Sequence, residues 1–245
     1  MTGTDAGAAA TVRPDAVVAS LRDAILTGVL APGEAVTEAL VADSFRVARP
    51  TARIAIDRLV ADGLLAREPH HAARVRRLDR ADLADLFAAR AAVESAAVEL
   101  LAGTRAIPDA ASAAHEKLLA LDADASYWAI DIAFHRALVQ GSPSTRLPRL
   151  HDQLMGEIEL AIAQVDAHRL RSTREVEAEH GRILDAVAAG DAALAEHLTR
   201  SHILASRDRL LAHYDAQHAD SQHPDAQHSA AQHPAAEHSD SQPER

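Results

Sequence analysis

Apolar positions in the first third of the chain recur at helical spacing and then change to strand spacing. Residues 14–28 predict a first helix, whose apolar face carries Val17, Val18, Leu21, Ile25 and Leu26. Thr37 is a suitable N-cap for a short second helix over residues 38–45, and a tight turn leads to a third helix over residues 51–63. Two short alternating runs, LLARE and ARVRRL, follow and indicate a hairpin. This order of elements predicts a winged helix-turn-helix.

The pattern after residue 79 is helical throughout, with no further strand signal. Breaks at Gly103, Pro108, the GSP triplet and Gly190 separate the apolar stripes. The stripes predict six helices, at about 79–103, 108–122, 124–141, 143–166, 172–189 and 191–213. The fold class is therefore mostly α, with a winged helix-turn-helix domain over residues 13–78 followed by an all-α helical bundle over residues 79–213.

Both ends of the chain have a different composition from these two domains. After Tyr214 a histidine recurs every five residues, from His218 to His238, and this spacing matches neither a helix nor a strand. We therefore expect residues 1–12 and the His-rich tail, residues 214–245, to be disordered. The tail imidazoles could bind divalent metal loosely, or the tail could simply be a solvated low-complexity segment.

Composition limits the location and chemistry of the protein. The 245 residues include no cysteine, which excludes disulfides and thiolate sites. No apolar run approaches the roughly 18 to 20 residues of a membrane span, and the N-terminus lacks signal-peptide features, so we expect a cytoplasmic protein without a membrane partner. The net charge of -11 is uneven: residues 1–78 carry 10 arginines against 9 acids, whereas residues 79–245 carry 15 basic residues against 27 acids. The first domain is thus the relatively basic one.

The turn before the third helix carries candidate DNA-binding residues. Arg46, Arg49 and Arg53 surround the start of this helix, and Arg49 and Arg53 share one face. Guanidinium groups on a helix placed in the major groove can bind guanine O6 and N7, while Thr51 and free backbone N–H groups can hold phosphate. Ile54, Ile56, Leu59 and Val60 are expected to pack on the first two helices. A solvated cationic face is the alternative, but the surrounding winged helix-turn-helix pattern favours double-stranded DNA.

The segment LRDAILTGVLAPGEAVTEALVADSFRVARPTARIAIDRLVADGLLARE resembles the DNA-binding domain of GntR-family bacterial transcription regulators. The resemblance implies that Arg49 and Arg53 contact bases or adjacent phosphates and that the wing enters the minor groove. This sequence departs from the family pattern in two places. Arg46 replaces the usual turn glycine, and His70 and Ala72 stand where the wing usually has a glycine pair, so His70 is a candidate contact to the DNA backbone.

An acid and three histidines in the second domain form a candidate metal site. Asp131 and His135 lie one turn apart on an otherwise apolar helical face. His180 and His202 lie ten residues before and twelve residues after Gly190, so an antiparallel hairpin brings them to nearly equal height. Three imidazoles and one carboxylate suit a divalent ion such as Zn²⁺, Mn²⁺ or Ni²⁺.

Residues 79–213 also resemble the FCD ligand-binding domain of the FadR subfamily, in which an Asp and three His hold a metal in this order. The resemblance assigns the metal to Asp131, His135, His180 and His202. It also implies an effector-binding role for Arg90, because a buried arginine beside a metal favours a carboxylate ligand. An ion pair between Arg90 and Glu94 is the structural alternative.

The sequence therefore predicts a homodimeric transcriptional regulator, most simply a repressor, that binds a pseudo-palindromic operator. A divalent metal and a small organic acid effector in the helical domain would modulate DNA binding. A regulator that senses the metal alone is a second hypothesis. A metal-dependent hydrolase is a third and is disfavoured, because no Glu lies at a recognisable general-base spacing.

Overall fold

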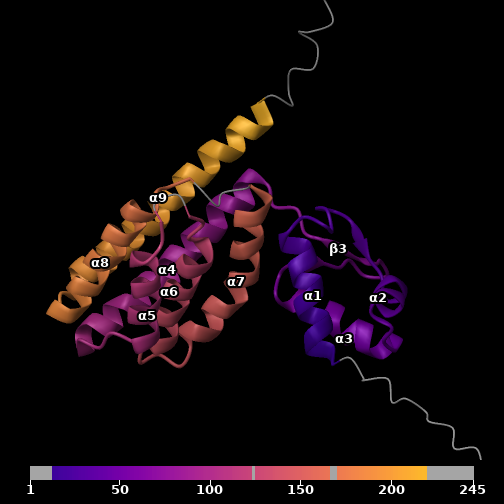
Figure 1. Cartoon of the computed structure of the whole chain (residues 1–245), viewed down its shortest axis with the longest axis horizontal. Coiled ribbons are helices and arrows are strands. Elements are labelled where there is room, and N and C mark those ends of the chain that lie inside the picture. Colours follow the sequence, from indigo (N-terminus) through magenta and orange to yellow (C-terminus); the bar gives the residue numbers. More distant parts are fainter. Residues whose placement is uncertain (1–12, 123–124, 166–169, 220–245) are drawn as a thin grey trace, which may run out of the picture.

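The structure is a computed structural model that describes residues 13–122, 125–165 and 170–219. The chain forms two domains that lie side by side (Figure 1): a smaller one over residues 13–78, here called the head, and a larger helical one over residues 79–219, here called the body. Residues 1–12 and 220–245, which include most of the two segments expected to be disordered, lie outside the described residues.

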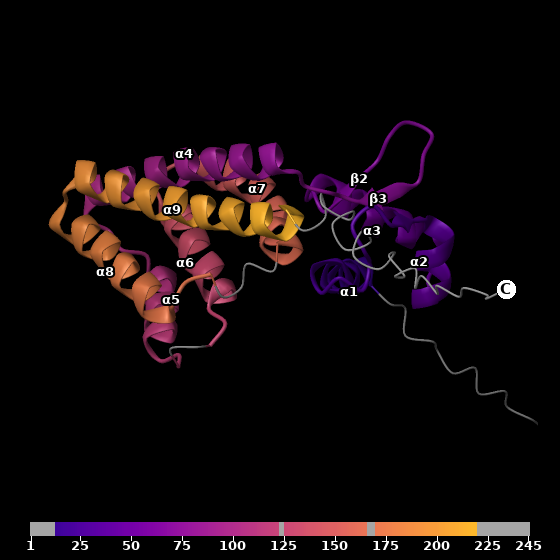
Figure 2. The ribbon, with the colours of Figure 1, turned by 90° about the horizontal axis from the view of Figure 1, so that it is seen from above.

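The head contains the predicted elements and one more strand. Its elements are α1 (Pro14–Leu26), β1 (Ala35–Val36), α2 (Glu38–Phe45), α3 (Arg49–Ala61), β2 (Leu65–Ala66) and β3 (Ala73–Val75). The strands form an antiparallel sheet in the order β1-β3-β2. Figure 2 shows the loop between β2 and β3 projecting from the head as a wing. Strand β1 was missed because two residues are too few to show alternation.

The apolar face of α1 is buried as predicted, whereas one residue of α3 is not. Ala52, Ala55, Ile56 and Leu59 form the buried stripe of α3 at helical spacing. Ile54 lies outside that stripe and is 46% exposed, so the expectation that it packs on the first two helices was wrong. Helix α3 also begins at Arg49, two residues before the predicted start, because Pro50 is well suited to its first turn.

The body consists of six helices in its described part, in agreement with the predicted number. They are α4 (Arg80–Thr104), α5 (Asp109–Leu119), α6 (Trp128–Gly141), α7 (Leu147–Gln164), α8 (Thr173–Ala189) and α9 (Ala192–Ala219). Capping boxes begin α4 at Asp79 and α8 at Ser172, and Gly190 ends α8 with a φ of 77°. Helix α7 starts later than predicted, because the Ser144 hydroxyl accepts hydrogen bonds from the backbone N–H groups of Arg146 and Leu147.

Helix α9 continues to Ala219, six residues beyond its predicted end at residue 213 and into the segment expected to be disordered. The side chain of Gln217 donates a hydrogen bond to the carbonyl of Val165, and the rings of Tyr214 and His218 stack with centroids 3.9 Å apart. These contacts to α7 and within α9 hold the extra turns in place. Among the described residues, no helix combines the length and apolarity needed to cross a membrane.

Helix α7 of the body packs against the head. Its Glu159 accepts a hydrogen bond from Arg22 of α1 at 2.5 Å, and its Glu157 pairs with Arg76 at 2.8 Å. Gly156 lies against the backbone of Asp62 at the end of α3, where a Cβ atom would collide with the Asp62 carbonyl. The end of α3 is therefore in direct contact with a helix of the body.

Candidate metal centre and DNA interface

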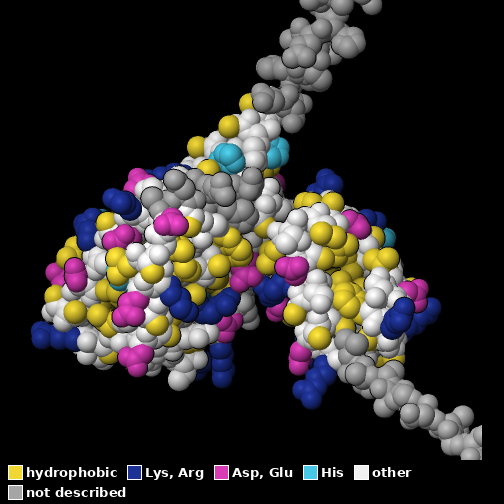
Figure 3. Space-filling view, viewed as in Figure 1, with side chains coloured by type: hydrophobic (Ala, Val, Ile, Leu, Met, Phe, Trp, Pro, Cys, Tyr) yellow, Lys and Arg dark blue, Asp and Glu magenta, His cyan; other side chains and the backbone are white. Residues whose placement is uncertain are grey.

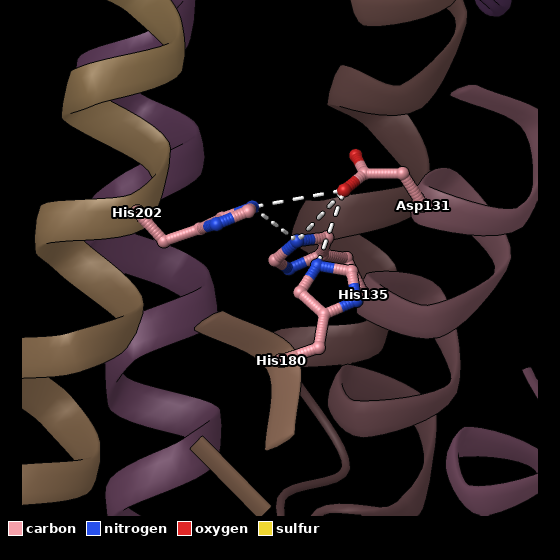
Figure 4. Close-up of side chains that lie close together, drawn as sticks. All are labelled: Asp131, His135, His180 and His202. Atoms are coloured by element: carbon pink, nitrogen blue, oxygen red, sulfur yellow. Dashed lines mark hydrogen bonds and ion pairs between the residues drawn. The ribbon is translucent and has the colours of Figure 1, made fainter. Parts of the chain in front are cut away.

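Four side chains from three helices converge in the centre of the body. Asp131 and His135 come from α6, His180 from α8 and His202 from α9, and their ligand atoms all lie within 4.8 Å of one another. Figure 4 shows one oxygen of Asp131 facing all three imidazoles. The hairpin at Gly190 brings His180 and His202 to the same level, as the count of residues predicts.

The ligand atoms of these four side chains lie close to one another. Oδ1 of Asp131 lies 3.2 Å from Nε2 of His180, 3.6 Å from Nε2 of His202 and 3.7 Å from Nε2 of His135. The Nε2 atoms of His135 and His202 are 3.1 Å apart. Apart from this 3.2 Å contact with Asp131, neither nitrogen of His180 makes a well-aligned hydrogen bond with a described residue. All of the histidine Nε2 atoms thus face one point beside Asp131.

Burial and neighbouring charge set the protonation of this cluster without metal. Burial alone would raise the pKa of Asp131, but His135 and hydrogen bonds from the imidazoles outweigh it and hold that pKa well below its usual range. Burial lowers the pKa of His135, but the charges of Glu94 and Asp131 prevail and raise it to about 9. Burial dominates at His180 and lowers its pKa to about 3. Without metal, the carboxylate is therefore ionised and His180 is neutral, whereas His135 carries a second proton at neutral pH that a bound metal ion would displace.

The histidine rings are held from outside in two different ways. Nδ1 of His135 lies 2.6 Å from Oε2 of Glu94, and Nδ1 of His202 lies 2.6 Å from Oε2 of Glu179. The ring of His180 instead stacks on Phe134, with centroids 3.9 Å apart and an angle of 8° between the planes. From the sequence, Glu94 was expected only as a partner for Arg90, and Glu179 was not expected here, because neither has a distinctive spacing to the histidines.

A pocket adjoins the cluster, with Asp131 and His202 on one of its walls. Arg90 lines it, and its Nε donates to Glu94 at 2.8 Å, which is the ion pair that stood as the structural alternative to an effector contact; its Nη2 lies 3.7 Å from Asp131. Arg171, which the sequence analysis missed, also lines it and pairs with Glu179. The remaining lining is largely apolar, with Tyr127, Ser206 and the exposed Arg209 beside the apolar side chains of Phe87, Trp128, Ile162, Leu170, Val176 and Leu210. The pocket therefore offers two buried guanidinium groups within an apolar surface.

The predicted DNA-binding residues lie at the start of α3 and on the preceding turn. Arg46, Arg49 and Arg53 are exposed, and Thr51 is half-buried in the first turn of α3. Arg46 and Arg49 form no ion pair with any described residue, whereas Arg53 lies 3.8 Å from Asp57 and 4.0 Å from Glu38. The N-cap of α3 is Ala48, which makes no side-chain capping bond. This end of α3 therefore presents positive charge, but Pro50 has no N–H and the N–H groups of Thr51 and Ala52 donate to the Ala48 carbonyl, so the first turn offers fewer free N–H groups for phosphate than expected.

His70 lies in the wing between β2 and β3, with a φ of 67°. It is exposed, as is its neighbour His71. At the base of the wing, Arg67 pairs with Asp57 of α3 at 2.6 Å.

In the space-filling view of Figure 3, Lys and Arg side chains are interspersed with Asp and Glu on both domains. No single patch of one charge covers the face of the molecule that this view shows.

Both domains match known families. Residues 14–75 match the gntR family of bacterial regulatory proteins, and residues 85–205 match the FCD domain. An HTH-type transcriptional regulator in an unstable DNA locus of Streptomyces ambofaciens is 30% identical over 201 residues, covering 79% of this chain and 84% of that protein. This chain belongs to the GntR family of transcriptional regulators. Its combination of a GntR head with an FCD body is consistent with the FadR subfamily.

Further relatives agree with this assignment. A protein from Paenarthrobacter nicotinovorans, named a probable D-xylose utilization operon transcriptional repressor, is 29% identical over 77% of this chain and 86% of its own. A GntR transcriptional regulator from Rhodococcus sp. RHA1 has a solved structure with a TM-score of 0.65 and 25% identity, covering 81% of this chain and 97% of that one. GntR heads bind DNA operators and FCD domains bind small-molecule effectors, so the chain is a transcriptional regulator rather than a hydrolase.

Proposed function

We propose that this GntR regulator represses transcription from a pseudo-palindromic operator, in the cytoplasm, as a homodimer whose FCD domain binds a divalent metal and a small organic acid. The observation that carries the proposal is the convergence of Asp131 and three histidines beside a pocket that holds two buried arginines. The same chain carries exposed arginines at the start of its recognition helix. Binding of the acid would alter operator affinity through the contact between body and head.

The donor set fits a metal ion. Ligands placed about 2.0 to 2.1 Å from a tetrahedral or octahedral ion are separated from their neighbours by roughly 2.8 to 3.4 Å. Two of the separations here, 3.1 Å and 3.2 Å, fall in that range, two more are 3.6 Å and 3.7 Å, and all lie within 4.8 Å. A bound cation would also engage Nε2 of His180, which lies 3.2 Å from Asp131 but makes no well-aligned hydrogen bond among the described residues. The three nitrogens and one oxygen suit Zn²⁺, Mn²⁺ or Ni²⁺.

The pocket arginines favour an anionic effector. Nη2 of Arg90 and Nε of Arg171 are both buried and have no hydrogen-bond partner among the described residues. A carboxylate in the pocket would satisfy these donors and approach the metal from its open side. The apolar wall would contact the carbon skeleton of the acid.

The metal part of this proposal is tested by His180→Ala, with His197→Ala as the matched control. His197 is exposed on α9, whereas His180 is fully buried in the cluster. Both variants are made in a chain from which residues 220–245 are deleted, so that tail histidines contribute no metal. Elemental analysis should give about one metal ion per chain for the control and markedly less for His180→Ala. Equal metal content in both would refute the site.

The DNA part is tested by Arg49→Ala, with Arg200→Ala on α9 as the control. Arg49 is exposed at the first position of α3, so its loss should abolish specific operator binding in a gel shift without lowering the melting temperature. Arg200 is exposed on the body, and its replacement should leave binding unchanged. Intact specific binding by Arg49→Ala would contradict the assigned role.

A single measurement distinguishes the proposed effector-binding regulator from the alternative, a regulator that senses the metal alone. A set of organic acids is added to the metal-loaded protein, and the melting temperature is recorded. A rise with one acid, lost in Arg90→Gln, supports an organic effector. If no acid acts and the metal alone changes operator affinity, then the metal is the signal.

A further inference from the structure

Two carboxylates outside the metal cluster make the same pair of contacts. Oε2 of Glu94 lies 2.6 Å from Nδ1 of His135, and its Oε1 accepts from Nε of Arg90 at 2.8 Å. Oε2 of Glu179 lies 2.6 Å from Nδ1 of His202, and its Oε1 pairs with Arg171. Each carboxylate thus holds one histidine of the cluster with one oxygen and one arginine of the pocket with the other.

These contacts set which nitrogen of each ring faces the cluster. Both are made at Nδ1, through a hydrogen bond at His202 and a close ion pair at His135, and a carboxylate at Nδ1 leaves Nε2 available to a metal ion. The Nε2 atoms of the two rings are 3.1 Å apart and both lie near Asp131, so they face a common centre. The carboxylates also prevent these two rings from rotating about the bond between Cβ and the ring.

Because the contact between Glu94 and His135 is buried, removing either group would destabilise the other. The Glu94 side chain is 1% exposed and His135 is fully buried, so neither group can take water in place of the other. His151, which is also buried, lies with its Nε2 2.9 Å from Oε1 of Glu94 and completes the contacts of that oxygen. Glu179 is 33% exposed and can be replaced with less disturbance of the fold.

We propose that Glu94 and Glu179 are positioning residues that orient His135 and His202 toward the metal and, through their second oxygens, fix Arg90 and Arg171 in the effector pocket. This inference rests on the proposed metal site and extends it to two residues outside the ligand set. It predicts that either carboxylate contributes to metal affinity without touching the ion. It further predicts that His180, which stacks on Phe134, needs no such carboxylate.

The experiment measures Zn²⁺ affinity of the full chain by competition with a chromophoric chelator at fixed pH. Outer carboxylates of metal-binding histidines typically contribute 10- to 100-fold to affinity, so Glu179→Gln and Glu94→Gln should each weaken binding by about this factor. Glu179→Ala should weaken it more than Glu179→Gln, because the amide oxygen of Gln can still accept from Nδ1. Glu99→Gln on α4 and Glu177→Gln on α8 are the matched controls and should remain within about twofold of the unmodified protein.

Two further measurements keep the outcomes distinct. The melting temperature of each metal-free variant shows whether it is folded, and Asp131→Asn with His135→Ala gives the background from the tail histidines. In the Co²⁺-loaded protein, the visible spectrum should change in Glu179→Gln and stay constant in Glu177→Gln. If folded Glu94→Gln and Glu179→Gln bind Zn²⁺ within twofold of the unmodified protein, the positioning role is overturned while the metal site stands. If the unmodified protein binds no more Zn²⁺ than the background variant, both proposals are overturned.

Discussion

Glu159 should contribute measurably to the contact between head and body. It lies on α7, is only 12% exposed, and accepts hydrogen bonds from Arg22 at 2.5 Å and from Arg136 at 3.2 Å. Arg136 directly follows His135 on α6, and Arg22 also donates to Asp62 at the end of α3 at 2.9 Å. This carboxylate therefore lies between the helix that carries two candidate metal ligands and the recognition helix.

The perturbation is Glu159→Gln, which preserves the shape of the side chain and removes its charge. A hydrogen bond to a charged group contributes about 1.5 to 3 kcal/mol when shielded from water. Arg22 and Arg136 are 29% and 38% exposed, so screening reduces each contact to about 1 kcal/mol. We expect a loss of about 2 kcal/mol in the free energy of unfolding, with about 1 kcal/mol of coupling to Arg22 in a double-mutant cycle.

The assay is urea unfolding followed by two signals. The single tryptophan, Trp128, lies on α6, so its fluorescence reports on the body, whereas far-ultraviolet circular dichroism reports on the helices of both domains. The two midpoints should coincide in the unmodified protein. They should separate in Glu159→Gln, because the contact between head and body is weakened. Glu99→Gln, on the exposed side of α4, is the control. A coupling free energy below about 0.3 kcal/mol between Arg22 and Glu159 would refute the reasoning.

Three further predictions concern other residues. Burial raises the pKa of the Tyr127 phenol to about 12, so in Tyr214→Phe the phenolate absorbance should appear with a midpoint near that pH. The stability due to the neutral Tyr127 is complete below about pH 10 and is lost as the pH rises through about 12, and a flat stability between these values would contradict its burial. Arg46 adopts a left-handed conformation with a φ of 52°, so Arg46→Gly should stabilise the head by about 0.5 to 1 kcal/mol in chemical unfolding; a loss of stability would show that its side chain makes a necessary contact. Removal of metal with a chelator should lower the free energy of unfolding by about 2.7 kcal/mol if free metal had stood at 100 times its dissociation constant, and Asp131→Asn should show no such drop.

Local signals along the chain were enough to predict most elements of the fold. The cap at Thr37 is present, with its hydroxyl accepting from the N–H of Leu40 at 3.1 Å, because capping depends on residues three apart. The positions of His180 and His202 followed from counting residues on either side of Gly190, since helical rise is constant. Strand β1 and the end of α9 at Ala219 were missed, because both depend on contacts with distant segments, such as β3 and Val165.

The partners of the buried charges could not be predicted in the same way. Glu94 contacts His151 across 57 positions, and Glu179 contacts His202 across 23. Glu159 contacts Arg22 across 137 positions. An acid on a helix shows no local feature that distinguishes a buried partner of a histidine from a solvated residue such as Glu99.

The amino-acid sequence alone determined the order of helices, the winged helix-turn-helix of the head and the four residues of the candidate metal centre, because periodicity and helical rise are local properties. Long-range packing selected Glu94, Glu179 and Arg171 as neighbours of that centre and placed Glu159 between body and head. A buried charge is stable only beside a compensating group, and which group lies within about 3 Å depends on how the helices pack.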